Sequence, residues 1–223
     1  MTETLTLVDE AELAEISERF ETASASAVMR WARDRFGASL VLASSFQDSV
    51  LIDVAVRQFP EIDVVFLDTG FHFPETLDYV ETVRQRYDLN LRVIGPTLGP
   101  DEWPCGTDRC CELRKVAPLA RALEGREAWM TGLRRTEAAT RAEAPIVGRD
   151  EARGLIKVNP LATWSDQDVS GYVIEHGLPV HPLTNRGFAS IGCAPTTRAV
   201  LPGEDPRAGR WSGTDKTECG IHV

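Results

Sequence analysis

The chain lacks the segments that would place it in a membrane. No stretch of its 223 residues approaches the roughly 20 apolar residues of a membrane-spanning helix. No apolar signal segment opens it, because residues 1–20 are acidic and amphipathic. Its hydrophobic content of 43% is nevertheless enough for a full core. These features predict a cytoplasmic protein with no membrane partner.

Basic charge is also in short supply. The chain has 24 Lys and Arg residues against 34 Asp and Glu residues, for a net charge of −10. No overall cationic field exists to attract phosphates, which argues against a general nucleic-acid binder. A small anionic ligand stays open wherever basic residues converge locally. The simplest explanation of the excess acidic charge is that it keeps the protein soluble.

Cysteine is scarce and odd in number. The five cysteines are Cys105, Cys110, Cys111, Cys193 and Cys219. An odd number argues against a closed disulfide framework. The adjacent pair cannot readily bond to each other without a strained ring. Reduced, clustered thiols in the cytoplasm, where disulfides are rare, indicate metal binding or catalysis.

The last cysteine stands in a tail of different composition. From Leu201 onward, residues 201–223 contain closely spaced prolines and glycines, which predicts a flexible arm. Cys219 lies between Lys216 and His222, and neighbouring cations lower the pKa of a thiol. A mobile arm with a reactive thiol can approach a substrate held elsewhere. An incidental cysteine is the alternative.

The apolar pattern of residues 1–200 predicts a single α/β domain. Two helices within residues 1–37 precede an alternation of short apolar runs and amphipathic segments. Strands are expected at 40–43, 64–67, 91–94, 129–131 and 156–161, and helices at 50–59, 74–87, 110–123 and 165–173. This alternation predicts a parallel sheet with helices on both faces.

Three loops follow predicted strands, where open α/β sheets bind ligands. The loop 44–49 suits an anion through its hydroxyls and backbone N–H groups, although it lacks the glycines and lysine of a P-loop. The loop 68–70 offers a carboxylate to a ribose or base, and the pair 134–135 offers guanidinium forks. A polar turn, a tight glycine turn and surface arginines are the structural alternatives. The candidate binding residues are Ser44, Ser45, Gln47, Asp48, Ser49, Asp68, Thr69, Gly70, Arg134 and Arg135.

The remaining cysteines suggest a metal site. Iron–sulfur clusters are commonly held by four thiolates, and Cys110, Cys111 and Cys193 supply three. Thr196 stands where a Cys-x-x-Cys pair would have its second cysteine. The fourth site is therefore open, or Cys105 fills it. Zinc on three cysteines and another ligand competes with this hypothesis, as do free cysteines without metal.

Seven short motifs occur in a fixed order between residue 40 and the end of the chain. They are Ser44-Ser45-Phe46-Gln47-Asp48-Ser49, Leu67-Asp68-Thr69-Gly70 with His72-Phe73-Pro74-Glu75-Thr76, Cys110-Cys111-x3-Lys115, Thr131-Gly132-Leu133-Arg134-Arg135, Gly192-Cys193-x-Pro195, Asp205-Pro206-Arg207-x2-Arg210-Trp211 and Lys216-x-Glu218-Cys219-Gly220-x-His222. No single motif is specific, but the combination is. Together they resemble the assimilatory adenylyl-sulfate reductases of the phosphoadenylyl-sulfate reductase family.

The resemblance implies a fold, a reaction and site residues. It implies an adenine-nucleotide α-hydrolase-like fold and reduction of adenylyl sulfate to sulfite and AMP, with thioredoxin as reductant, in sulfate assimilation and cysteine biosynthesis. The family's nucleophile maps onto Cys219, which would form an S-sulfocysteine that thioredoxin resolves. The family's substrate contacts map onto Lys115, Arg207, Arg210 and His222.

The resemblance also bears on cofactor and substrate. Family branches that use adenylyl sulfate carry a [4Fe–4S] cluster, which maps onto Cys110, Cys111 and Cys193, while branches that use 3′-phosphoadenylyl sulfate generally lack these cysteines. Adenylyl sulfate is therefore the expected substrate and its 3′-phosphorylated form the alternative.

An ATP pyrophosphatase of the same fold and a cluster-based nucleotide-binding redox sensor are the rival functions. The oligomeric state, a homo-oligomer included, stays open.

Overall fold

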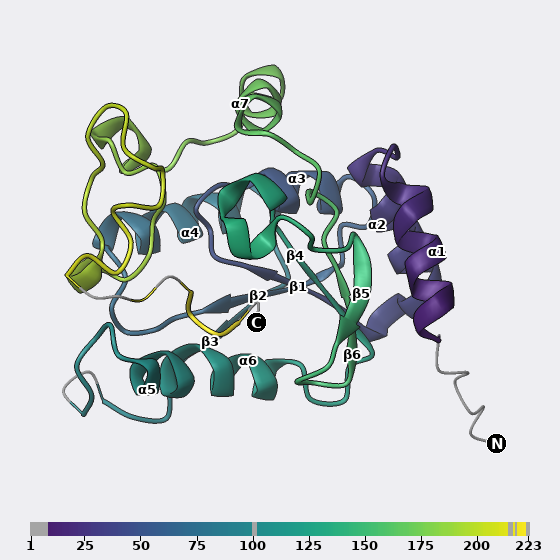
Figure 1. The fold of residues 1–223 in the computed structure, drawn as a ribbon, viewed down its shortest axis with the longest axis horizontal. Coiled ribbons are helices and arrows are strands. Elements are labelled where there is room, and N and C mark those ends of the chain that lie inside the picture. Colours follow the sequence, from purple (N-terminus) through teal and green to yellow (C-terminus); the bar gives the residue numbers. More distant parts are fainter. Residues whose placement is uncertain (1–8, 100–101, 214–215, 217, 222–223) are drawn as a thin grey trace.

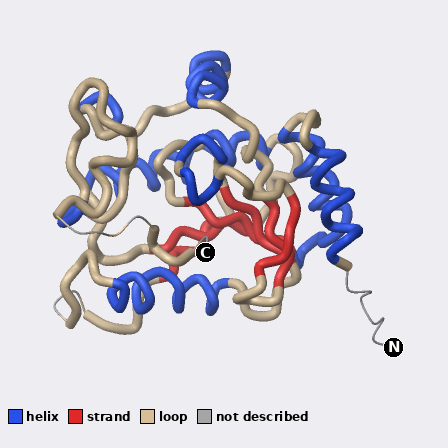
Figure 2. Tube along the Cα trace, in the orientation of Figure 1, coloured by secondary structure: helices blue, strands red, loops and turns tan. Residues whose placement is uncertain are grey.

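The computed structural model describes residues 9–99, 102–213, 216 and 218–221. A six-stranded sheet in the order β3-β2-β1-β4-β6-β5 forms its centre (Figures 1 and 2). The strands are β1 (Leu40–Ser44), β2 (Asp63–Leu67), β3 (Leu91–Ile94), β4 (Ala128–Thr131), β5 (Val147–Asp150) and β6 (Leu155–Val158). All neighbouring pairs are parallel except β5 with β6. The predicted parallel sheet is confirmed.

Helices cover both faces of this sheet (Figure 1). They are α1 (Glu10–Phe20), α2 (Ala25–Phe36), α3 (Val50–Val56), α4 (Pro74–Tyr87), α5 (Asp108–Cys111), α6 (Ala117–Ala122) and α7 (Asp166–Glu175). Successive strand residues point to opposite faces. Leu42 and Val64 accordingly join the large core with α1 to α4, whereas Val41 and Val65 join a smaller core with α6. Within the described residues, no helix is long and apolar enough to cross a bilayer.

Strand β5 was not predicted. Its four residues, Val147-Gly148-Arg149-Asp150, lack the apolar run that marks the other strands. It pairs only with β6, antiparallel, at the edge of the sheet. Helix α1 packs on it, and the Ser17 hydroxyl accepts a hydrogen bond from the backbone N–H of Ile146 at 2.9 Å. Three of its four residues are buried, but a glycine, an arginine and an aspartate occupy three of its positions, so the strand has no apolar run.

The predicted helix 110–123 is confirmed with one irregularity. Helical structure runs from Asp108 to Ala122, but residues Glu112–Val116 form a π-helical turn between α5 and α6. Such turns are rare and often occur at functional sites. Here the turn carries Arg114 and Lys115 under the carboxyl ends of the strands, where both side chains contact the loops of the candidate site.

Candidate active site

The carboxyl ends of β1, β2 and β4 open into a cavity of about 200 Å³, which we call the main cavity. Its walls come from the strand-end loops, the helical run after Asp108, the loop around residue 190 and the tail. The sequence-predicted residues that line it are Ser44, Ser45, Gln47, Asp48, Thr69, Lys115, Arg134, Arg207, Arg210 and Cys219. The fold therefore brings most of the candidate binding residues and the candidate nucleophile to one place.

Three residues of the first two strand-end loops do not reach the main cavity. The Ser49 side chain is fully buried at the start of α3. Asp68 accepts a hydrogen bond from the backbone N–H of Gly70 at 2.9 Å, and Gly70 is exposed with φ +74°. Residues 68–70 thus form a tight turn that needs a glycine, which was the structural alternative to a binding loop. His222, also predicted to bind substrate, lies outside the described residues.

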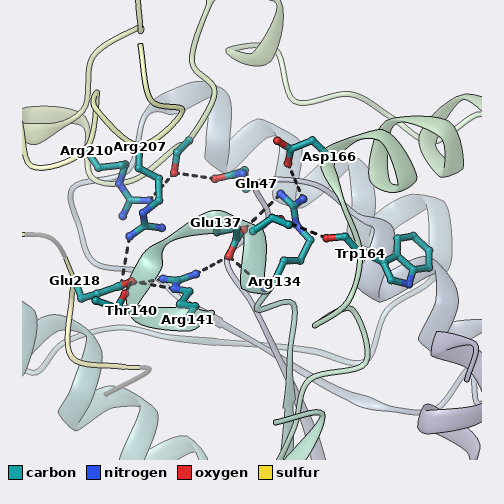
Figure 3. Close-up of polar contacts among 12 residues, drawn as sticks. Gln47, Arg134, Glu137, Thr140, Arg141, Trp164, Asp166, Arg207, Arg210 and Glu218 are labelled. Carbon is teal, nitrogen blue, oxygen red and sulfur yellow. Dashed lines mark hydrogen bonds and ion pairs between the residues drawn. The ribbon is translucent and has the colours of Figure 1, made fainter. Parts of the chain in front are cut away.

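Arg134 and Arg135 point in different directions, and only Arg134 lines the main cavity. Arg134 lines the main cavity and pairs with Asp166 at 2.6 Å (Figure 3). Arg135 instead donates to both Glu21 carboxylate oxygens, at 2.6 and 2.7 Å, and this hydrogen bonding lowers the pKa of Glu21. Arg134 is the extended residue before a 3-10 turn that begins at Arg135, and the two side chains leave the backbone in different directions there.

Glu218 and its sequence neighbour Cys219 both line the main cavity. Figure 3 shows Glu218 beside Arg141, Thr140 and Arg207. Its carboxylate accepts from Arg141 at 2.8 and 2.9 Å and lies 3.3 Å from the Arg207 guanidinium. The Thr140 hydroxyl donates to it at 3.2 Å. Burial by itself raises the pKa of Glu218, but Arg141, Arg207 and Thr140 together outweigh burial and the net shift is downward. The paired carboxylate fixes the half-buried Cys219 beside the cavity.

Arg141 and Glu218 are site residues to which the sequence analysis assigned no role. Arg141 lies in an alanine-rich segment without a motif, and its one local signal is Glu137 four residues earlier. Such a pair usually marks an exposed helix face. The Arg141 side chain is instead only 9% exposed and lines the main cavity. Glu218 stood inside a recognised motif, so its position next to Cys219 was the available signal.

A second set of contacts joins Arg210 to the first strand-end loop. Arg210 donates to the Ser190 hydroxyl at 3.1 Å and to the Ile191 carbonyl at 3.3 Å, while Gln47 accepts from the backbone N–H of Ile191 at 2.9 Å. A Cβ at Gly192 would lie 2.5 Å from the Arg210 guanidinium, so a larger residue at this position would displace the Arg210 side chain. Burial lowers the pKa of Arg210, which leaves a desolvated cation that favours an anionic partner.

A second cavity, of about 10 Å³, lies against the first and is lined by four thiols; we call it the thiol cavity. Cys105, Cys110, Cys111 and Cys193 all line it, together with Thr196. A hydrogen bond with the Cys105 thiol lowers the pKa of Cys193, against the opposing effect of burial. Four thiols in one wall are a donor set that suits an iron–sulfur cluster.

Lys115 lines both cavities. Burial disfavours its charged form, but the negative charges of Cys193 and Cys219 outweigh burial and raise its pKa. The ammonium group therefore stays charged between the thiol cavity and the candidate nucleophile.

Within the described residues, no three Cys, His, Asp or Glu side chains converge on one point as the ligands of a single metal ion.

The fold and the main cavity define an α/β protein with a thiol and a group of cations at the carboxyl ends of its strands. Residues 39–199 match the phosphoadenosine phosphosulfate reductase domain. The chain belongs to this family of oxidoreductases, and the resemblance inferred from its motifs is confirmed.

Relatives and solved structures agree on this placement. Adenosine 5′-phosphosulfate reductase of Mycolicibacterium smegmatis is 45% identical over 98% of both chains, and that of Streptomyces coelicolor 48% over 95% of both. The phosphoadenylyl-sulfate reductase of Candida auris, a phosphate complex, has a TM-score of 0.76 at 28% identity and covers 88% of this chain and 100% of its own. Candida glabrata FMN adenylyltransferase, at 15% identity and a TM-score of 0.60, covers 84% of this chain and 71% of its own and shares the fold alone. These structures confirm the predicted adenine-nucleotide α-hydrolase-like fold.

Proposed function

We propose that this chain reduces adenylyl sulfate to sulfite and AMP, in sulfate assimilation in the cytoplasm. One observation carries the proposal: Cys219 lies on the wall of a cavity that Lys115, Arg207 and Arg210 also line. The names of the two bacterial relatives support adenylyl sulfate as the substrate. Cations that converge in this cavity supply a local site for an anion on a chain whose net charge is −10.

The first half of the reaction uses the thiolate of Cys219. The strand-end loops, with Ser44 and Thr69, hold the nucleotide, and the cations hold the phosphosulfate. The thiolate attacks the sulfur atom, a new S–S bond forms, and the S–O bond to phosphate breaks. AMP leaves with the electron pair of that bond. The product is an S-sulfocysteine, a covalent intermediate that divides the reaction into two steps.

The second half requires a dithiol, which we propose is thioredoxin. Its first thiolate attacks the Cys219 sulfur, and sulfite leaves with the electron pair of the S–S bond. The second thiol then resolves the mixed disulfide, so the dithiol supplies both electrons. For this step Cys219 must leave the cavity wall, which requires that the contacts of Glu218 with Arg141 and Arg207 break. The flexibility of the tail stays a prediction.

We further propose that the thiol cavity holds a [4Fe–4S] cluster, with Cys110, Cys111 and Cys193 among its ligands. The support is the donor set, because four thiols line one cavity and thiolates are the usual cluster ligands. A bound cluster supplies a compact, charged and polarisable group beside Lys115. A cluster would also support adenylyl sulfate as the substrate, because the family branches that carry one use adenylyl sulfate. The 3′-phosphorylated form remains the alternative substrate.

Sulfite release in the presence of thioredoxin tests the reaction, with the two nucleotides compared as substrates. Incubation with adenylyl sulfate alone should add one sulfonate to the peptide that contains Cys219, as measured by mass spectrometry. An adduct on Cys110 or Cys193 instead would contradict the assignment. Release of pyrophosphate from ATP would support an ATP pyrophosphatase, and nucleotide binding without turnover would support a redox sensor.

A further inference from the structure

We infer that Cys105 supplies the fourth thiolate of the cluster, in the place that Thr196 leaves without one. This inference rests on the proposed cluster and deepens it. Cys105 belongs to none of the recognised motifs and lies five residues before Cys110, in the loop that leads into α5. Its assignment comes from where the fold places its sulfur atom.

The first step of the argument is the position of Thr196. Cys193 and Thr196 lie at the two ends of a short 3-10 turn (Ala194–Thr196), in which the Thr196 N–H donates to the Cys193 carbonyl at 3.1 Å. The Cys105 sulfur lies 3.8 Å from the Thr196 hydroxyl oxygen. A cysteine at position 196 would carry its sulfur on the same side of the turn. Cys105 therefore reaches the same part of the wall of the thiol cavity from another segment.

The second step is the backbone that brings Cys105 there. Gly106 has φ +98°, a conformation that favours glycine, so the chain turns sharply directly after Cys105. Thr107 then caps α5: its hydroxyl accepts from the Cys110 N–H at 3.1 Å and donates to the Pro104 carbonyl at 3.4 Å. This turn folds the segment before α5 back over the helix start. Cys105 and the Cys110-Cys111 pair consequently line the same cavity.

The third step is ligand chemistry. A neutral threonine hydroxyl is a poor iron ligand beside a thiolate, because clusters select soft sulfur donors. With Cys105, the thiol cavity contains four thiols and needs no ligand from outside the chain. Cys105 is half-buried, whereas the other three are buried, so Cys105 is the most solvent-accessible of the four thiols.

The test exchanges the two positions in the full-length protein, purified without air. Iron, sulfide and visible absorption are measured for wild type, Cys105→Ser, Thr196→Cys and the double variant Cys105→Ser/Thr196→Cys. We expect Cys105→Ser to lose iron to a chelator at least about tenfold faster than wild type. Loss of a residue that only hydrogen-bonds to a metal ligand already weakens metal binding by about tenfold or more, and loss of a ligand should cost no less. The double variant should return to the wild-type rate. Cys219→Ser, which removes a thiol outside the thiol cavity, is the matched control and should keep its iron.

The single variant Thr196→Cys keeps the inference testable even where Cys105→Ser does not fold. With Cys105 as ligand the set is already complete, so Thr196→Cys should bind no more iron than wild type. More iron in that variant, or wild-type iron retention in a folded Cys105→Ser, would overturn the role of Cys105 and leave the proposed cluster intact. Wild-type protein that binds zinc alone, or no iron after reconstitution, would instead overturn the cluster itself.

Discussion

The main cavity and the thiol cavity lie side by side but are built in different ways. The main cavity takes its walls from at least six separated segments and is rich in charge. The cysteines of the thiol cavity come from two short segments, residues 105–111 and residue 193. The two share Thr69, Lys115, Arg210 and Trp211. The proposed roles divide in the same way: anion recognition and sulfur chemistry in the main cavity, and cluster binding in the thiol cavity.

The largest expected effect is the loss of sulfite release in a variant of the main cavity, with no change in the iron content of the thiol cavity. We expect Cys219→Ser to abolish sulfite release, because a serine hydroxyl cannot form the S-sulfo intermediate. Nucleotide affinity, measured by calorimetry with AMP, and iron content should both stay near wild type. A variant that still releases sulfite at a measurable rate would place the nucleophile among the cysteines of the thiol cavity.

The next effect concerns the contact that holds the nucleophile. Arg141→Ala leaves the Glu218 carboxylate without its main partner and should displace Cys219. We expect kcat to fall on the order of 100-fold, the cost of a small misplacement of a reacting group, while iron content does not change. Steady-state kinetics measure the effect. An unchanged kcat would show that the tail reaches the substrate without this contact.

The same contact should respond to pH. The pKa of Glu218 is lowered from its ordinary value of 4.5, so its contribution to tail docking is complete above pH 4.5. The contribution is then lost as the pH falls through the lowered pKa of the docked state. Limited proteolysis should therefore cut the tail faster in acid. In Glu218→Gln the cutting rate should be high and independent of pH over that range, and equal rates in both proteins would contradict the role.

A smaller effect is expected from the cations that face the anion. Arg207→Ala and Arg210→Ala should each weaken substrate binding by about 1.5–3 kcal/mol, the range for hydrogen bonds to charged groups. This corresponds to roughly 10- to 150-fold in Kd. Affinity for AMP, which lacks the sulfate, should fall less. A near-wild-type KM in both variants would place the anion elsewhere in the main cavity.

The smallest effect is expected from Arg135, the neighbour that faces away from the main cavity. Arg135→Ala should leave kcat/KM within about twofold of wild type. It removes the partly exposed ion pair with Glu21, which contributes about 0–1 kcal/mol to stability. The melting temperature should fall by no more than about 4 °C. A large rise in KM would restore Arg135 to the site and remove the distinction drawn between it and Arg134.

Much of the fold could be predicted from local patterns. Apolar-rich runs marked the five parallel strands, because the central strands of a parallel sheet are largely buried. The edge strand β5 carries no such run and was missed. Strand alternation also predicted that the loops at 44, 68 and 131 would meet at one edge. It could not predict the direction of each side chain, and neither Ser49 nor Arg135 lines the main cavity.

The sequence by itself determined the family, the α/β sheet and the reactive and charged groups of the chain. These groups are a tail thiol, clustered cysteines and basic residues after the strands. These follow from residue identity and spacing, which act locally. The tertiary structure alone decided that Arg141 meets Glu218, 77 residues away, and that Cys105 lies beside Thr196, 91 residues away. Contacts at such separations depend on how elements pack and how loops turn, and no local pattern encodes them.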